Sequence, residues 1–325
     1  MKRVELLKKL KIFDLLGFTY FKFNKLFFKY SKSSKLLYDE KSQNIIHVIK
    51  ETKNYDSIPK IIWMFWNDDN LPLEIQTFVD KIKTENPTYD VKILNFSNLN
   101  YYVSDLIFDD NVDIPIANKT DLIRLALLYK FGGVWLDITT ILFQPIDEFL
   151  NIENINNYDL IAFYYEKTTT DLNRPMIESW FLAAPPRSQF IYEWLEALYP
   201  LLHLGSKDYY NKVKARADYD LIVQKITRPE YLLVYLAQQI VMLNSDNKFN
   251  FYLRKCDSSA FYIQEYFNWN PFEIHKYLAF KDLNNVVPSP IIKLTSGDRL
   301  FMNILFKYDL IVTNSILGAL LKYRN

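Results

Sequence analysis

The sequence predicts an α/β fold, and three observations support this. Short apolar strands alternate with helical patterns along the first half of the chain, an order that builds a sheet covered by helices. A Gly132-Gly133 pair separates a helical pattern from an apolar strand, and the chain has only six glycines in all. The 325 residues are 50% hydrophobic, which suffices for one large core or two tightly joined halves.

The elements of the first half follow from apolar spacing and turn residues. Residues 1–50 are helical in pattern, and residues 53–59 form a linker. We then expect a strand at 60–66, a loop at 67–72, a helix at 73–84, a strand at 91–96, helix and loop over 98–113, a helix at 121–130 and a strand at 134–137. This alternation is typical of a nucleotide-binding half.

The second half is less regular. We expect strands at 160–164, 180–184 and 291–294, with a polar loop at 166–175. Helices are expected at 188–202, 209–217, 228–243 and 300–323, and Pro229 lies near the start of the third. No internal repeat is present.

The stretch Thr120–Thr140 is the most informative part of the chain. Thr120 is a good helix N-cap, and the acidic residue after it suits the positive end of the helix dipole. A helix over 121–130 is roughly 15 Å long at 1.5 Å per residue. The strand over 134–137 runs back about 13 Å. The two lengths nearly cancel, so the end of the strand should lie near the start of the helix.

Three charged side chains should therefore meet. Asp121 and Arg124 lie one helical turn apart, and Asp137 ends its strand at the edge where ligands of open α/β sheets bind. Such a group suits the binding of a sugar nucleotide. The alternative is a buried Asp–Arg pair that only clamps the helix to the sheet.

Two segments together resemble a known family. The opening strand Ile58–Trp66 (IPKIIWMFW) and the central stretch are similar to bacterial capsular polysaccharide synthesis glycosyltransferases. Those are related to DXD-type sugar transferases and, more distantly, to the catalytic domains of clostridial glucosylating toxins. The central signature is matched by Asp121, Arg124, Leu128, Gly132, Gly133, Trp135 and Asp137. Weaker matches at Asn86–Leu94, Ile177–Ile191 and Lys293–Thr295 extend the resemblance over about residues 56–298.

The resemblance implies a GT-A-like fold, in which a nucleotide-sugar-binding sheet is flanked by helices, with added N- and C-terminal helices. It divides the chain into a basic amphipathic helical arm (1–52), a transferase domain (53–298, with donor half 53–150 and acceptor half 151–298) and a C-terminal helix (299–325). The implied reaction moves a sugar from a UDP- or GDP-linked donor to a glycan acceptor. That acceptor would be a lipid-linked capsule or exopolysaccharide repeat unit, and the configuration would be retained. The alternative is inversion, which would need a carboxylate base, for which Glu178 is the candidate.

The resemblance also assigns roles to residues. It implies that four side chains act on the donor sugar, diphosphate or acceptor: Asp121, Arg124, Asp137 and Glu178. It implies donor contacts from Trp63, Trp66, Trp135, Thr139, Lys293 and Thr295, with Trp63 or Trp66 stacking on the nucleobase. His275 is a further candidate for a diphosphate contact. For His275 and for each tryptophan, packing in the core is the alternative.

One departure from the family pattern concerns the metal. A DXD motif holds Mn²⁺ or Mg²⁺ with two carboxylates, but this chain has Asp137-Ile138-Thr139. We expect Asp137 to be the metal ligand, with Thr139 offering a neutral, weaker hydroxyl. The alternative is a catalytically degenerate protein that binds a sugar nucleotide or glycan without turnover. A glycoside hydrolase would need two carboxylates about 5 to 10 Å apart, but the nearby Arg124 favours a phosphate-bearing ligand.

The N-terminal charge is the second informative feature. Residues 1–35 hold ten Lys or Arg and two acidic residues, a net charge of +8, whereas the whole chain carries +1. Leu6, Leu7, Leu10 and Phe13 share a helical face, and no apolar run is long enough to span a bilayer. We therefore expect an arm that lies on an anionic membrane surface. The alternative is a helix packed on the body with its lysines solvated.

Composition argues against several other classes of protein. Cys256 is the only cysteine, so neither an intrachain disulfide nor a cysteine-based zinc site is possible. A short basic arm on an acidic body leaves no broad positive stripe, and we expect no nucleic-acid partner. We expect a cytoplasmic protein, peripheral to the inner face of the cell membrane.

Overall fold

The computed structural model describes residues 12–244, 248–284 and 286–322. Within these residues, seven strands form a mixed sheet in the order β1-β8-β6-β7-β4-β2-β3, and two more pair as β5-β9. The large sheet contains β1 (Ile45–Val48), β2 (Ile61–Phe65), β3 (Asp90–Leu94), β4 (Gly133–Leu136), β6 (Leu160–Tyr164), β7 (Ile177–Ala184) and β8 (Phe251–Lys255). The small sheet contains β5 (Thr140–Leu142) and β9 (Ile291–Lys293). The predicted α/β class is confirmed.

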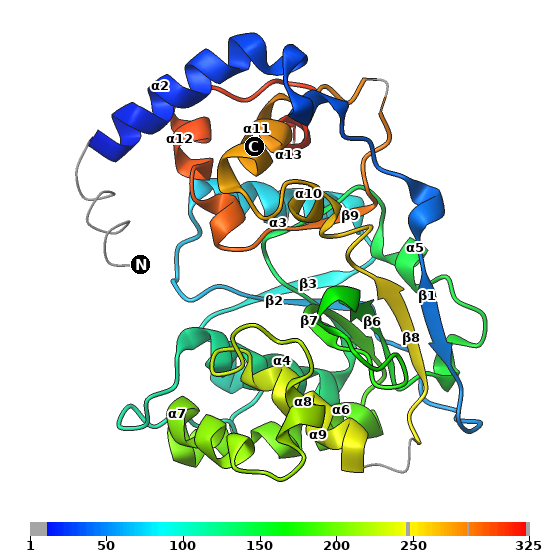
Figure 1. Cartoon of the computed structure of the whole chain (residues 1–325). Helices are drawn as coiled ribbons and strands as arrows, with labels where there is room; N and C mark the ends of the chain where they lie inside the picture. Colours follow the sequence, from blue (N-terminus) through cyan, green and yellow to red (C-terminus); the bar gives the residue numbers. More distant parts are fainter. Residues whose placement is uncertain (1–11, 245–247, 285, 323–325) are drawn as a thin grey trace.

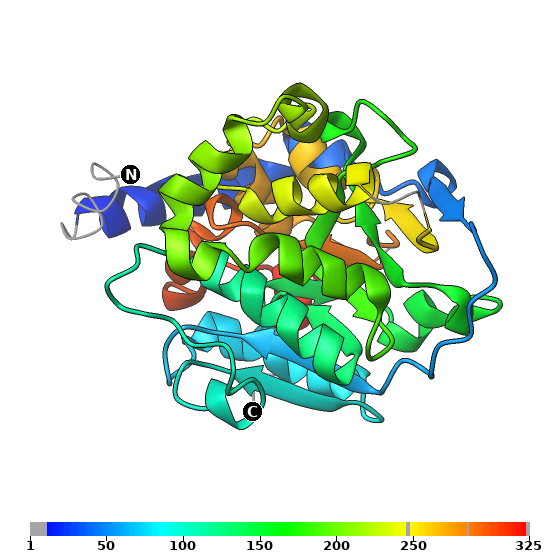
Figure 2. The ribbon, with the colours of Figure 1, turned by 90° about the horizontal axis from the view of Figure 1, so that it is seen from below.

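Helices cover both faces of the large sheet (Figure 1). One face carries α4 (Ile116–Phe131), α6 (Gln189–Leu198), α7 (Leu201–Lys214), α8 (Tyr219–Val223) and α9 (Leu233–Asn244). Figure 2 shows these helices from below. Above the sheet lie α2 (Ile12–Phe27), α3 (Leu73–Glu85), α10 (Tyr262–Tyr266), α11 (Pro271–Phe280), α12 (Met302–Lys307) and α13 (Ile316–Leu321), while α5 (Ile146–Leu150) lies near β1. Each face therefore has its own hydrophobic core.

The first half folds as the alternation predicts. Strand β2 pairs in parallel with both β3 and β4. The predicted strand at 60–66, helix at 73–84 and strand at 91–96 correspond to β2, α3 and β3 with small differences at their ends. Parallel pairing places the carboxyl ends of β2 and β4 at one edge of the sheet, and the candidate site forms there.

The turn between α4 and β4 requires glycine at two successive positions. Gly132 and Gly133 have φ of +64° and +99°, a region that favours glycine. A Cβ at Gly133 would lie 2.8 Å from the carbonyl oxygen of Ile61, and one at Gly132 would lie 2.6 Å from the nitrogen of Pro186. The pair thus lets β4 run back close beside β2, and the predicted reversal is confirmed.

The predicted start of this helix is wrong. Helix α4 begins at Ile116, where Pro115 with φ of −55° leads into the first turn. Thr120 is not the N-cap, because its hydroxyl donates to the carbonyl of Ile116 within the helix. Asp121 and Arg124 therefore lie beyond the first turn, and the helix-dipole argument for Asp121 is lost.

In the second half of the chain, several helices begin or end at other residues than predicted. The helix expected at 188–202 ends at Leu198, and α7 starts after Pro200. The helix expected at 228–243 starts only at Leu233. The single helix expected at 300–323 is wrong: α12 and α13 are separate, since Asp309 has φ of +50° and Ser315 caps α13.

Three strands were missed by the sequence interpretation. Strand β1 lies inside the arm expected to be helical, and it pairs antiparallel with β8, which was not predicted either. Strand β5 follows Thr139 directly and pairs antiparallel with β9. This last pairing brings the segment after Asp137 beside a segment from the far end of the chain.

Helix α2 packs on the body through one face only. Phe21 is fully buried against the C-terminal helices, the rings of Phe13 and Phe301 stack at 5.5 Å, and Asp14 pairs with Lys307 at 2.6 Å. Leu6, Leu7 and Leu10, which were expected on one face of the arm, lie outside the described residues. Across the described part of the chain, every helix is too short or too polar to cross a bilayer.

Candidate functional site

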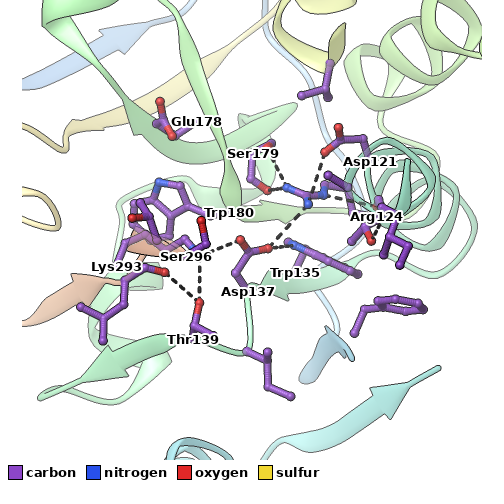
Figure 3. A pocket seen from close by; sticks show the side chains of 18 of the residues that line it. Asp121, Arg124, Trp135, Asp137, Thr139, Glu178, Ser179, Trp180, Lys293 and Ser296 are labelled. Atoms are coloured by element: carbon purple, nitrogen blue, oxygen red, sulfur yellow. Dashed lines mark hydrogen bonds and ion pairs between the residues drawn. The ribbon is translucent and has the colours of Figure 1, made fainter. Parts of the chain in front are cut away.

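A cavity of about 490 Å³ lies at the carboxyl ends of β2 and β4. Its walls come from elements far apart in sequence (Figure 3). They include Trp66 after β2, Asp121 and Arg124 on α4, Trp135 and Asp137 at the end of β4, Glu178 and Trp180 on β7, Tyr235 on α9, Lys293 on β9 and Arg299 after it. The cavity is large enough for a small-molecule ligand.

The predicted meeting of three charged groups at this cavity is confirmed. The Arg124 guanidinium lies 3.3 Å from Asp121 and 3.6 Å from Asp137. Its other terminal nitrogen donates to the backbone carbonyl of Ser179 at 2.5 Å and to the Ser179 hydroxyl at 2.6 Å. Arg124 also lies over the Trp135 ring, 5.0 Å from its centroid. Arg124 thus fixes both carboxylates at the cavity and ties α4 to β7.

The two carboxylates differ electrostatically. Burial raises the pKa of Asp121 to about 6, and the nearby Arg124 only partly offsets this. Burial also opposes ionisation of Asp137, but Lys293 and Arg124 outweigh it and hold its pKa below the usual range. Asp137 is therefore anionic at neutral pH, whereas Asp121 gains a proton more readily.

Asp137 has cationic or N–H partners at both of its oxygens. Oδ1 accepts from the Trp135 indole at 3.0 Å and faces Arg124, while Oδ2 lies 2.8 Å from the Lys293 ammonium. The Thr139 hydroxyl donates to the carbonyl of Leu294 and accepts from Lys293 at 3.1 Å. Asp137, Thr139 and Lys293 form one linked group (Figure 3).

This donor set does not fit the expected divalent metal. A hard dication needs several oxygen ligands, preferably anionic. Here one carboxylate is shared by two cationic side chains, and the Thr139 hydroxyl is already engaged on both sides. Over residues 12–244, 248–284 and 286–322, no group of three or more His, Cys, Asp and Glu side chains could hold a metal ion.

Glu178 lies in the same cavity, on β7. It is buried, and Oε2 accepts a hydrogen bond from the Tyr235 hydroxyl at 2.9 Å. Burial raises the pKa of Glu178 to about 7, although the bond from Tyr235 works against this rise. A carboxyl group titrating near neutrality can hold or release a proton at physiological pH.

The predicted tryptophans separate into two groups. Trp66 and Trp135 line the cavity, and the indole N–H of Trp66 is buried without a hydrogen-bond partner in the described structure. Trp63 is elsewhere: its indole donates to the carbonyl of Gly132, and its ring packs on Tyr102 and Phe131. The role given to Trp63 is therefore wrong, because side chains alternate along a strand and Trp63 faces the opposite core to Trp66.

The site residues predicted near the C-terminus, Thr295 and His275, also differ in where they lie. Thr295 lines the cavity, but its amide and hydroxyl both donate to Asp298 at 2.8 Å, so it mainly shapes the turn. His275 packs in the upper core, where its Nδ1 meets the carbonyl of Pro271 and its Nε2 accepts from the amide of Phe301. Burial lowers the pKa of His275 to about 4, so this residue packs in the core as a neutral ring.

The sequence interpretation missed Arg299, Ser179 and Tyr235. Arg299 lines the cavity, and its Nε is buried without a hydrogen-bond partner in the described part of the chain. A signal for it existed, because it follows the Lys293–Thr295 match within a polar turn. Tyr235 gave no such signal, since it lies in an apolar helix whose packing only the fold reveals.

Comparison with known proteins gives one family and several distant relatives. The family described as "Capsular polysaccharide synthesis protein" matches residues 18–287. The chain is 26% identical over 179 residues to "O-glycosyltransferase braB" of Annulohypoxylon truncatum, covering 49% of this chain and 41% of that protein. It is 26% identical over 158 residues to "Inositol phosphoceramide mannosyltransferase 1" of Schizosaccharomyces pombe, covering 46% and 45%. The matches thus span less than half the length of these two relatives.

Three further similarities are also present. "Toxin A" of Clostridium novyi is 30% identical over 141 residues, covering 42% of this chain and 6% of the toxin. Among solved structures, "PaToxG Glycosyltransferase" is 14% identical with a TM-score of 0.34, covering 82% of this chain and 89% of that chain. An active-site mutant of LgtC is 10% identical with a TM-score of 0.37, covering 76% and 95%.

Proposed function

The chain belongs to the capsular polysaccharide synthesis protein family, and we propose that it is a glycosyltransferase acting at the cavity around Asp137. The observation that carries this proposal is the convergence of Asp121, Arg124 and Asp137 beside the cationic Lys293 in a cavity of about 490 Å³. The names of the relatives as transferases support it. The reaction transfers a sugar from a nucleotide-sugar donor to a glycan acceptor.

The donor is a UDP- or GDP-linked sugar. Trp66 lines the cavity and offers an aromatic face for the base. Asp121 and Asp137 accept hydrogen bonds from sugar hydroxyls, while Lys293 and Arg299 give the cavity a cationic side suited to a diphosphate. We assign no step to a metal ion, because the donor set around Asp137 does not fit one.

The transfer proceeds with retention of configuration. The bond between the anomeric carbon and the diphosphate oxygen breaks, and that oxygen keeps the electron pair. The acceptor hydroxyl oxygen bonds to the anomeric carbon, and its proton passes to the departing diphosphate. Glu178, held by Tyr235, orients the acceptor hydroxyl. Fixed charges that stabilise the leaving group supply much of the rate enhancement.

The acceptor is a lipid-linked repeat unit of a capsule or exopolysaccharide, and the protein works at the inner face of the cell membrane. Helix α2 supports this part of the proposal. Its outer face exposes Leu16, Phe23 and Leu26 by 65%, 63% and 70%, although each is a large apolar side chain. Lys22, Lys25 and Lys29 lie among or just after them, which suits an anionic surface.

A second candidate function is binding without turnover. It is favoured by Thr139, which stands where a DXD motif would have its second aspartate. The two candidates are separated by incubating the full chain with UDP- and GDP-linked hexoses and membrane extract, and measuring released UDP or GDP. Release of nucleotide with labelling of lipid supports the transferase. Calorimetric binding of UDP or GDP with no release supports the binding protein.

A further inference from the structure

The ammonium of Lys293 lies between the two residues that a DXD motif would use for a metal. It is 2.8 Å from Asp137 Oδ2 and 3.1 Å from the Thr139 hydroxyl (Figure 3). In a DXD motif, both of these positions would carry carboxylates around a dication. Here one of the two negative charges is missing and one positive charge has been added.

The fold holds this ammonium in place. Lys293 is the last residue of β9, and it lies opposite Thr140 in the β5-β9 pair. Its amide donates to the carbonyl of Ala260 at 3.1 Å, and its carbonyl accepts from the Gln264 side chain at 2.7 Å. The side chain is mostly buried. The cation is therefore positioned before any ligand arrives, which is what electrostatic stabilisation of a leaving group requires.

A dication at this position would face an unfavourable environment. Besides Asp137 it would meet the Lys293 ammonium and the Arg124 guanidinium, which lies 3.6 Å from the same carboxylate. The hydroxyl hydrogen of Thr139 is directed to the carbonyl of Leu294. Like charges at such distances repel strongly in a buried site. The lysine occupies the position and supplies the positive charge itself.

Arg299 offers a second cation in the same cavity. It lies beyond the turn that follows β9, and its Nε is buried with no hydrogen-bond partner in the described structure. A buried donor without a partner is unfavourable unless a ligand satisfies it. A phosphate oxygen is a suitable acceptor, since guanidinium groups bind phosphates with charge-assisted hydrogen bonds.

We propose that Lys293, assisted by Arg299, replaces the divalent metal ion of this site and binds the diphosphate of the donor directly. The inference rests on the proposed function and deepens it. As the anomeric bond breaks, the ammonium of Lys293 and the guanidinium of Arg299 neutralise the charge that develops on the departing nucleoside diphosphate. Asp137 holds the ammonium and contacts the donor sugar.

Calorimetry on the full chain tests this inference, with UDP and GDP as probes, in EDTA and in Mn²⁺. The wild type binds one of the two nucleotides in EDTA with an affinity within about twofold of that in Mn²⁺, because charged side chains supply the contacts. Lys293→Ala loses about tenfold or more of this affinity in EDTA. Lys81→Ala is the matched control, since Lys81 is similarly buried and paired with Glu85 at 2.8 Å but lies outside the cavity.

A double variant provides the converse test. Thr139→Asp with Lys293→Ala restores two carboxylates and removes the ammonium, so its nucleotide binding should depend on Mn²⁺ and disappear in EDTA. The inference is overturned if wild-type binding requires Mn²⁺, a result that needs no variant to fold. It is also overturned if Lys293→Ala binds in EDTA like the wild type. If the wild type binds neither UDP nor GDP in either condition, the proposed function itself fails.

Discussion

Arg124 shows how a structural contact and a functional one coincide in a single residue. Its donors reach the carbonyl of Thr120, both acceptors of Ser179 and the two carboxylates. The clamp between helix and sheet, first considered as an alternative to a site, therefore exists. It also sets the positions of Asp121 and Asp137 at the cavity. Arg124 is best described as a positioning residue.

At the residue scale, replacing Asp137 tests the centre of the site. Asp137→Ala should lower transfer by about a hundredfold or more, because removing a preorganised electrostatic partner costs that much in other enzymes. The protein should remain folded, since Lys293 keeps its contact with Thr139. Nucleotide release measures the first effect and circular dichroism the second.

The control is Asp147→Ala, which removes an exposed carboxylate paired with Lys60. It should leave transfer unchanged. Near-normal transfer by Asp137→Ala, with the control also active, would remove Asp137 from the reaction.

Glu178 gives a prediction about pH and stability. Its pKa is raised from 4.5 to about 7 by burial, so the folded state binds this proton more tightly than the unfolded state does. The stabilisation that this proton gives the folded state is complete below about pH 4.5 and is lost as the pH rises through about 7. Glu178→Gln should therefore be more stable than the wild type at pH 8, by up to about 3 kcal/mol, and no more stable at pH 4.

Urea unfolding at the two pH values measures this difference. Tyr235 can still donate to the amide oxygen of the glutamine, so packing is preserved. Equal stability differences at both pH values would show that the Glu178 carboxyl does not titrate as proposed.

At the scale of elements, α2 has two apolar faces with different surroundings. Phe21 is buried against the C-terminal helices, as is Phe28 in the turn that follows α2, so this part of the arm packs on the body as the alternative interpretation held. The opposite face leaves Leu16, Phe23 and Leu26 exposed. A helix that exposes several large apolar residues beside lysines suits a membrane interface.

A triple substitution tests this surface. Together, Leu16→Ser, Phe23→Ser and Leu26→Ser should weaken binding to phosphatidylglycerol vesicles by about a hundredfold, because each position loses apolar area that the membrane would bury. Co-sedimentation with the vesicles measures this binding. The matched control replaces three exposed apolar residues elsewhere: Ile107→Ser, Leu172→Ser and Leu221→Ser. Undiminished sedimentation of the α2 variant would exclude this face as the membrane contact. Deleting residues 1–35 is a less clean test, because it also uncovers the core around Phe21.

The elements of the first half were predictable because local signals and tertiary pairing agree there. The apolar strand patterns, the helical spacing and the glycine pair each predicted an element that the structure contains. Edge strand β1 and the short β5 were not predictable, since their pairing depends on partners more than a hundred residues away. The start of α4 was misplaced because Thr120 and Pro115 both signal a helix start, and the proline decides it.

At the scale of the molecule, the cavity joins segments that are far apart in the sequence, from Phe65 to Arg299. Residues from β2, α4 and β4 meet residues from β7 and β9 around it. A ligand that contacts several of these segments binds only the folded state, and so it stabilises the whole molecule.

This leads to a thermal prediction. UDP or GDP at about a hundred times its dissociation constant should stabilise the chain by about 2.7 kcal/mol. For 325 residues this raises the unfolding temperature by about 4 °C, taking the average unfolding entropy per residue. Scanning calorimetry measures it, with adenosine monophosphate as the control ligand. A shift for neither nucleotide would contradict a donor site in this cavity.

The candidate site was predictable in part. The convergence of Asp121, Arg124 and Asp137 followed from element lengths, and the placement of Trp66, Trp135 and Glu178 at the cavity agrees with the resemblance. The ion pair between Lys293 and Asp137 could not be predicted, because residue spacing does not reveal which strands pair when they are far apart in the sequence. Trp63 was misassigned because a strand's two faces cannot be told apart when both are buried.

The β5-β9 pair has a consequence for synthesis of the chain. Thr139 and Lys293 are 154 residues apart. At ribosomal speeds of about 5–20 residues per second, roughly 8 to 30 s pass between the emergence of the first strand and that of the second. During that interval the nascent chain carries Asp137 without the Lys293 ammonium that pairs with it in the folded protein. The pair between Asp137 and Lys293 therefore cannot form until β9 has left the ribosome, so this part of the cavity is assembled after β2, α4 and β4 have emerged.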